Sequence, residues 1–124
     1  MKRILIIDDA AEITTSLEYL FNLEGFQVFT AFNAEDGIRI AKNEKPNIII
    51  CDLMMPEKDG YYVIDELKKD SGTNSIPFII ITARSEPDEI KKGYSVGASH
   101  FFVKPFSIKE LIKVIDNILS ATTV

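Results

Sequence analysis

Five short apolar runs, each too short to form a helix alone, constrain the fold of this chain more than any other feature. The runs lie at 4–7, 26–31, 48–51, 78–81 and 101–103. Those at 4–7, 48–51 and 78–81 do not alternate with polar residues, which is typical of strands buried on both faces. Segments with helical spacing lie between the runs, and the clearest follows the last run, with a stripe formed by Ile108, Leu111, Ile112, Ile115, Ile118 and Leu119. The sequence therefore predicts a strand followed by a helix, repeated five times.

The helical segments differ in how strongly the sequence encodes them. Asn33 is a good N-cap for the second helix because its side chain can accept a hydrogen bond from a free backbone amide. The fourth helix, at about 87–95, is weak. Ile90 and Tyr94 are its expected apolar anchors, and Gly93 costs it about 1 kcal/mol relative to Ala.

Strands that alternate with helices predict an α/β fold. Such strands form a parallel sheet joined by right-handed crossovers, with helices on both faces. The expected architecture is a doubly wound five-stranded parallel sheet, whose ligand site lies beyond the carboxyl ends of the strands. A length of 124 residues fits one domain, 1–124, without an output domain. Residues 121–124 could equally mark where a longer protein was cut.

Charge and composition argue against several classes of protein. The chain has 14 basic and 19 acidic residues, a formal charge of -5, which disfavours direct binding to nucleic acid or to an anionic membrane surface. No apolar run approaches the ~20 residues of a membrane helix, and the first run is too short for a signal peptide. Cys51 is the only cysteine, so no internal disulfide can form, and its place before Asp52 favours a core position. We expect a cytoplasmic protein.

Four of the five runs are followed by polar residues, namely Asp8-Asp9, Asp52, Thr82 and Lys104. In a parallel sheet these strand ends meet at one edge. Three carboxylates at ~4 Å repel one another by ~1 to 4 kcal/mol per pair, and a divalent cation would relieve that repulsion. Oxygen ligands without His or Cys favour Mg²⁺.

A phosphoryl group suits the remaining side chains at this edge. The Thr82 hydroxyl and the Lys104 ammonium could hold phosphoryl oxygens, since phosphoryl transfer is catalysed mainly by positioning and charge neutralisation. A carboxylate can act as the nucleophile and form an acyl phosphate. Asp52 stands alone at its strand end and is the best candidate for the phosphoacceptor.

With these residues in place, the chain resembles a response-regulator receiver domain of the CheY type over essentially its whole length. That family has a (βα)5 flavodoxin-like fold with strand order 2-1-3-4-5. The resemblance rests on the order and spacing of 4–9, Asp52 to Pro56 with Asp59-Gly60, Thr82-Ala83, Gly97-Ala98 and Lys104-Pro105-Phe106.

The resemblance implies specific roles for these residues. Asp52 would be phosphorylated from a phosphohistidine on a sensor histidine kinase or a histidine phosphotransfer protein. Asp9 would bind Mg²⁺ directly and Asp8 mainly through water, and the backbone carbonyl of Met54 would complete the protein ligands. The chain would catalyse only its own phosphorylation and dephosphorylation.

The resemblance also implies a switch. Thr82 would move toward the phosphoryl group and Lys104 would pair with it, although both side chains would be free beforehand. Phe101 stands where the family has a switch aromatic, often Tyr, and could rotate inward without donating a hydrogen bond. The fourth helix, fifth strand and fifth helix would shift and bind a downstream effector, or link a monomer into a phosphorylation-dependent dimer.

Further residues around the site complete this expectation. Ala83 supplies the small side chain that the family prefers beside the site, and the peptide bond before Pro105 is expected to be cis. Met54 and Arg84 would flank the entrance for water and so set the hydrolysis rate of the acyl phosphate.

Other interpretations remain open from sequence alone. Asp8 and Asp9 could be an acidic turn that caps the first helix. A phosphatase with an Asp nucleophile would share the chemistry, but it typically has an Asp-x-Asp pattern after its first strand and a cap domain. A flavin mononucleotide module would need a phosphate-binding loop there, which residues 8–12 do not provide. A receiver that no longer needs phosphate is a further possibility.

Overall fold

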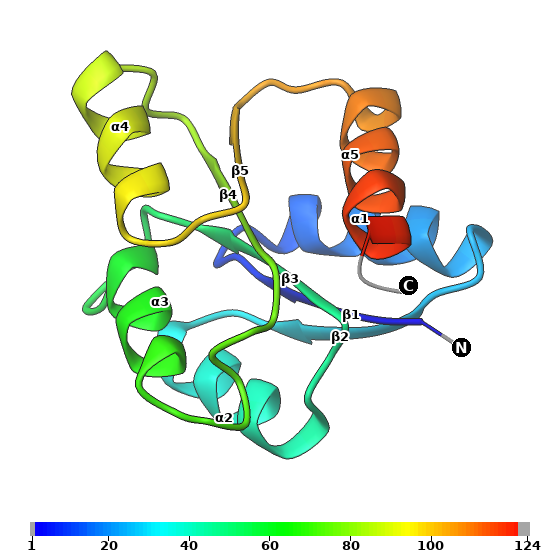
Figure 1. Ribbon diagram of the computed structural model, residues 1–124. Helices are drawn as coiled ribbons and strands as arrows, with labels where there is room; N and C mark the ends of the chain where they lie inside the picture. Colours follow the sequence, from blue (N-terminus) through cyan, green and yellow to red (C-terminus); the bar gives the residue numbers. More distant parts are fainter. Residues whose placement is uncertain (1, 122–124) are drawn as a thin grey trace.

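The computed structural model describes residues 2–121, so residues 122–124 of the terminal segment considered above lie outside the described residues. Strands and helices alternate strictly along the described chain (Figure 1). They are β1 (Arg3–Ile7), α1 (Ala11–Leu23), β2 (Gln27–Ala31), α2 (Ala34–Glu44), β3 (Ile48–Asp52), α3 (Gly60–Lys68), β4 (Phe78–Thr82), α4 (Pro87–Ser95), β5 (His100–Val103) and α5 (Ile108–Ala121).

All five strands are parallel and lie in the order β2-β1-β3-β4-β5, as the resemblance implied. Helices α1 and α5 cover one face of the sheet, and α2, α3 and α4 cover the other (Figure 1). The predicted doubly wound fold is therefore confirmed. Within residues 2–121, no helix is long and apolar enough to cross a membrane.

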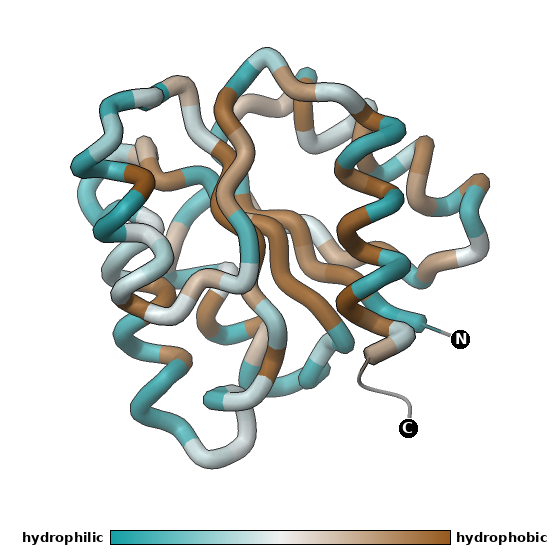
Figure 2. Tube along the Cα trace, turned by 45° about the horizontal axis from the view of Figure 1, so that its top comes forward, coloured by the Kyte–Doolittle hydropathy of each residue, from teal (hydrophilic) through white to brown (hydrophobic). Residues whose placement is uncertain are grey.

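The central strands supply both halves of the core. Alternate residues point to opposite faces of a strand, so Ile4 and Ile6 of β1 pack with α1 and α5, whereas Leu5 and Ile7 pack toward α2 and α3. Every residue of β3 and β4 is buried, which explains why their sequences do not alternate. The central strands are accordingly hydrophobic along most of their length (Figure 2). Cys51 is buried in this core, as expected, and its burial raises the pKa of the thiol.

Side-chain caps begin two of the helices that border the functional edge. Asn33 accepts a hydrogen bond from the Asp36 amide at 2.8 Å, as predicted. Asp59 does the same for α3, accepting from the Tyr62 amide at 3.0 Å. Both caps satisfy amides that a helix leaves unpaired at its start.

Helix α4 lies where the sequence placed it, but one of its expected anchors is wrong. Tyr94 is 44% exposed, so it is not a core contact. The buried residue is Gly93, whose missing side chain leaves room for Phe101; a Cβ there would lie 2.6 Å from Phe101 Cδ2. Close approach of β5 to α4, together with the half-buried side chain of Ile90, which packs against the core as predicted, therefore attaches this helix.

Candidate functional site

The strand register brings the predicted site residues to one edge of the sheet. Ile7 of β1 pairs with Cys51 of β3, so Asp8 and Asp52, which follow them, lie side by side. Asp52 pairs with Ile81 of β4, one residue before Thr82. Thr82 pairs with Val103 of β5, and the Lys104 amide continues the ladder by donating to the Thr82 carbonyl at 2.7 Å. The convergence predicted from sequence is confirmed.

Lys104 joins two of the carboxylates. Its ammonium lies 2.8 Å from Asp52 Oδ2 and 3.1 Å from Asp8 Oδ2. The expectation that this side chain is free in the unphosphorylated chain is therefore wrong, because two buried carboxylates need a cation that compensates their charge. Burial lowers the pKa of Lys104, but the hydrogen bonds with Asp52 and Asp8 outweigh it and raise the pKa overall.

Asp8 is held by the turn between β1 and α1. Its side chain has no exposed surface, and its Oδ1 accepts a hydrogen bond from the Ala10 amide at 2.9 Å. The Thr14 hydroxyl donates back to the carbonyls of Asp8 and Ala10 at 3.2 and 3.1 Å. The residue at the N-cap of α1 is Ala10, which has no capping side chain. Asp8 therefore belongs to the site and does not serve as a helix cap.

Three carboxylates form a group that could hold a metal ion. Carboxylate oxygens of Asp8, Asp9 and Asp52 all lie within 4.8 Å of one another. Burial, together with the charge of Asp52, raises the pKa of Asp8 against the opposing hydrogen bonds from Ala10 and Lys104. A hard divalent cation fits this donor set, since it would stabilise the ionised carboxylates that burial disfavours.

Thr82 is buried and also has a partner. Its hydroxyl oxygen accepts a hydrogen bond from the Arg84 amide at 3.3 Å, so the expectation of a free Thr82 side chain is wrong as well. Ala83 lies exposed in the loop between β4 and α4. The Lys104–Pro105 peptide bond is cis, as the resemblance implied.

The loop after β3 fixes the second oxygen of Asp52. The Met54 amide donates to Asp52 Oδ1 at 3.0 Å, and only 5% of Asp52 is exposed. Gly60 lets α3 begin directly against this loop: its amide donates to the Leu53 carbonyl at 3.1 Å, and a Cβ would lie 2.7 Å from the Asp52 carbonyl oxygen. The Asp59-Gly60 pair thus positions the end of β3.

Phe101 is already buried, with 8% of its surface exposed. It packs in the core cluster on the face of the sheet covered by α2, α3 and α4, against the space left by Gly93. The expected inward rotation therefore has no counterpart in this conformation. Its role as a switch residue stays a prediction.

Comparison with known protein families decides the class of this chain. The family model described as "Response regulator receiver domain" matches residues 4–116. The chain belongs to the response-regulator receiver family. Receiver domains are phosphoacceptor signalling modules of two-component systems rather than classical enzymes, and they usually bind Mg²⁺.

The receiver is similar both to proteins of about its own length and to proteins about twice as long. It is 42% identical over 118 residues to "Probable transcriptional regulator ycf27" of Porphyridium aerugineum, covering 95% of this chain and 48% of that protein. It is 34% identical over 120 residues to "Protein PilH" of Pseudomonas aeruginosa, covering 97% and 99%. The chemotaxis protein CheY4 of Vibrio cholerae has a TM-score of 0.89 at 25% identity, covering 95% and 98%. The chain thus spans about half the length of the first relative.

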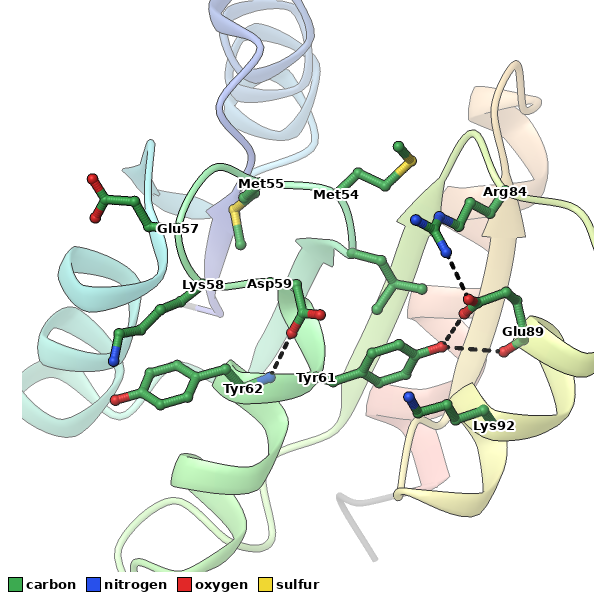
Figure 3. A pocket seen from close by; sticks show the side chains of 11 residues that line it. Met54, Met55, Glu57, Lys58, Asp59, Tyr61, Tyr62, Arg84, Glu89 and Lys92 are labelled. Atoms are coloured by element: carbon green, nitrogen blue, oxygen red, sulfur yellow. Dashed lines mark hydrogen bonds and ion pairs between the residues drawn. The ribbon is translucent and has the colours of Figure 1, made fainter.

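A groove of about 730 Å³ opens between the loop that follows β3 and the start of α4 (Figure 3). Met54, 47% exposed, and Arg84 both line it, and their role at the entrance for water stays a prediction. Sequence reasoning missed Tyr61 and Glu89, which join its two sides. In the sequence, Tyr61 directly follows Gly60 and Glu89 lies two residues after Pro87. These positions do not by themselves indicate that the two side chains meet.

Proposed function

We propose that this receiver accepts a phosphoryl group on Asp52 from a phosphohistidine of a sensor histidine kinase or a histidine phosphotransfer protein. The observation that carries the proposal is the setting of this carboxylate. Asp52 Oδ2 faces the Lys104 ammonium at 2.8 Å, and Asp52 Oδ1 accepts from the Met54 amide at 3.0 Å. Both contacts orient the carboxylate at the edge of the sheet where an incoming phosphoryl group can reach it.

The transfer exchanges one bond for another. An oxygen of Asp52 forms a bond to phosphorus while the bond between phosphorus and the histidine nitrogen breaks. The electron pair of the broken bond leaves with the imidazole, which takes up a proton. Lys104 then neutralises charge on the transferred group, and the Thr82 hydroxyl can turn from the Arg84 amide to donate to a phosphoryl oxygen.

The acidic cluster supplies the ligands for Mg²⁺. Asp9 and Asp52 would hold the ion through carboxylate oxygens and Asp8 mainly through water, with the Met54 carbonyl as a further ligand. The bound ion would neutralise negative charge on the phosphoryl oxygens. Lys104 occupies one oxygen each of Asp8 and Asp52, so the lysine must share these carboxylates with the ion.

The output surface proposed for this receiver is the face formed by α4, β5 and α5. A row of aromatic side chains crosses it: the rings of Tyr94 and His100 lie 6.4 Å apart, those of His100 and Phe102 4.7 Å, and those of Phe102 and Phe106 5.9 Å. Half-buried rings of this kind suit a partner protein or a second receiver. The chain would act through a downstream effector, as a monomer or as a phosphorylation-linked dimer.

Beryllofluoride, a stable mimic of the phosphoryl group, tests this proposal. The receiver is titrated with beryllofluoride and Mg²⁺ while amide resonances of α4 and β5 are followed by NMR. Shifts that need both reagents and vanish in Asp52→Asn are expected. Equal shifts in the variant, or none in the wild type, would contradict the proposal.

A further inference from the structure

A hydrogen-bonded network spans the groove between the loop after β3 and the start of α4 (Figure 3). The Tyr61 hydroxyl, on the first turn of α3, donates to the carboxylate of Glu89 on the first turn of α4. The other oxygen of Glu89 lies 2.8 Å from Arg84 Nη1. Glu89 therefore binds a donor on α3 and a donor in the loop before its own helix.

The contact between Tyr61 and α4 has a second part. The ammonium of Lys92, one turn after Glu89, lies 4.2 Å from the centroid of the Tyr61 ring. A cation above an aromatic face is attracted by the negative charge of that face. One tyrosine thus holds two successive turns of α4, one through its hydroxyl and one through its ring.

The protonation states of the pair strengthen this contact. The hydrogen bond from Tyr61 and the ion pair with Arg84 lower the pKa of Glu89, outweighing the opposite effect of burial. Burial, followed by the hydrogen bond to Glu89, raises the pKa of Tyr61. An ionised carboxylate and a neutral phenol are thus the favoured states at neutral pH, and a hydrogen bond between them is stronger than one between neutral groups.

The network also reaches both loops that flank Asp52. Arg84 provides the backbone amide that donates to the Thr82 hydroxyl at 3.3 Å. Tyr61 directly follows Gly60, whose amide is bound to the loop after β3. If Thr82 turns toward a phosphoryl group, the Arg84 amide loses its acceptor. Arg84, whose side chain binds Glu89, is then free to move.

We propose that Tyr61, Glu89 and Arg84 form a latch that holds α4 against α3 in the unphosphorylated receiver and opens when Thr82 turns toward the phosphoryl group. The coupling to phosphorylation rests on the function proposed above. Glu89 is the positioning residue at the centre of the latch. Helix α4 depends on it because Gly93 is its only fully buried residue and its N-cap residue, Glu86, makes no side-chain cap.

The latch predicts that a loosened α4 favours the phosphorylated conformation. A contact made only in the resting state shifts the equilibrium toward that state, so its removal shifts the equilibrium back. Losing one ordinary hydrogen bond corresponds to about a three- to tenfold change in an equilibrium constant, and a bond to an ionised carboxylate contributes at least as much. Phosphorylation should therefore become easier in the variant, whereas simple damage to the fold would make it harder.

Tyr61→Phe removes the hydroxyl and keeps the ring under Lys92. Tyr62→Phe is a matched control, because the Tyr62 ring lies 4.3 Å from the Lys58 ammonium but its hydroxyl donates to no residue that the structure describes. Glu89→Gln is a second variant, which weakens the acceptor while nearly preserving its shape. The full chain is treated with acetyl phosphate and Mg²⁺, and hydrogen exchange is followed at 87–95.

Tyr61→Phe and Glu89→Gln should speed amide exchange in α4 and raise the rate of phosphorylation by about three- to tenfold, while Tyr62→Phe matches the wild type. The latch would be overturned if the wild type is phosphorylated but Tyr61→Phe is phosphorylated no faster than Tyr62→Phe. A wild type that takes up no phosphoryl group would overturn the proposed function and, with it, the coupling of the latch.

Discussion

The ammonium of Lys104 lies 2.8 Å from the Asp52 carboxylate and bridges it to Asp8, so the unphosphorylated site already contains a paired cation. The lysine partly compensates the charge of the acidic cluster. It also competes for the oxygens that a metal ion would need. The same contact thus orients Asp52 and would limit the affinity of the site for Mg²⁺.

Lys104→Met should bind Mg²⁺ more tightly and accept phosphate more slowly. Removal of the ammonium frees one oxygen each of Asp8 and Asp52. It also removes the electrostatic repulsion between the ammonium and Mg²⁺, about 1 kcal/mol or more, so the affinity for Mg²⁺ should rise several-fold. Phosphorylation by acetyl phosphate should fall at least about tenfold, because the transferred group loses its cationic partner. Calorimetric titration with Mg²⁺ and a phosphorylation assay measure the two effects.

The control for Lys104→Met is Lys109→Met, which removes the same charge from the exposed first turn of α5. It should leave both quantities near the wild-type values. A Lys104→Met variant with weaker or unchanged Mg²⁺ binding would show that the lysine and the metal ion do not compete.

Gly93→Ala should destabilise the receiver although Ala is the better helix former. The added Cβ would lie 2.6 Å from Phe101 Cδ2 and 3.1 Å from Ile80 Cδ1, so the core must shift. Overpacking costs about 1 to 3 kcal/mol, against about 1 kcal/mol gained in helix propensity. Urea denaturation measures the balance, and combining the change with Phe101→Leu should restore stability. A stabilised Gly93→Ala variant would refute the close packing of α4 on β5.

Much of the fold could be predicted because its signals are local. The runs at β3 and β4 are apolar throughout, and burial on both faces of a parallel sheet requires that pattern. Asn33 begins α2 because capping depends on residues three apart in sequence. The convergence of Asp8, Asp52, Thr82 and Lys104 followed from the rule that parallel strands end at one edge.

What could not be predicted depends on contacts between distant residues. Tyr94 was assigned to the core from helical spacing, whereas the close approach of β5 places Gly93 there instead. Glu89 meets Tyr61 across 28 positions of sequence, and neither residue carries a motif. Lys104 and Thr82 were expected to be free because their sequence positions indicate only that they would contact a phosphoryl group on Asp52. Their partners in the unphosphorylated chain are contacts between residues that the sequence pattern does not pair.

Met54→Asn should shorten the lifetime of the acyl phosphate several-fold. The Met54 side chain is half exposed in the groove beside Asp52 and offers water no strong hydrogen bond, whereas an amide can orient an attacking water. Loss of the phosphoryl group after removal of the donor gives the lifetime. Glu57→Gln, an exposed change in the same loop, is the control. Equal lifetimes for Met54→Asn and the wild type would count against a role for this position.

The stabilising contact of Tyr61 should depend on pH in the alkaline range. Its folded-state pKa is raised from an ordinary value of 10.0, so the hydrogen bond contributes fully below that value. Above it the unfolded chain loses its proton first, and the contribution declines as pH rises. The free energy of unfolding should therefore differ between wild type and Tyr61→Phe by about 1 kcal/mol near neutral pH and by less above pH ~10. A difference that grows with alkaline pH would contradict the contact with Glu89.

The most direct test of the central claim is to locate the phosphoryl group. The receiver is phosphorylated with acetyl phosphate and Mg²⁺, the acyl phosphate is reduced with borohydride, and the modified residue is identified by mass spectrometry of peptides. We expect homoserine at position 52 in the wild type and no modification of Asp52→Asn. Modification of Asp8 or Asp9 instead, or of Asp52 without any need for Mg²⁺, would contradict it.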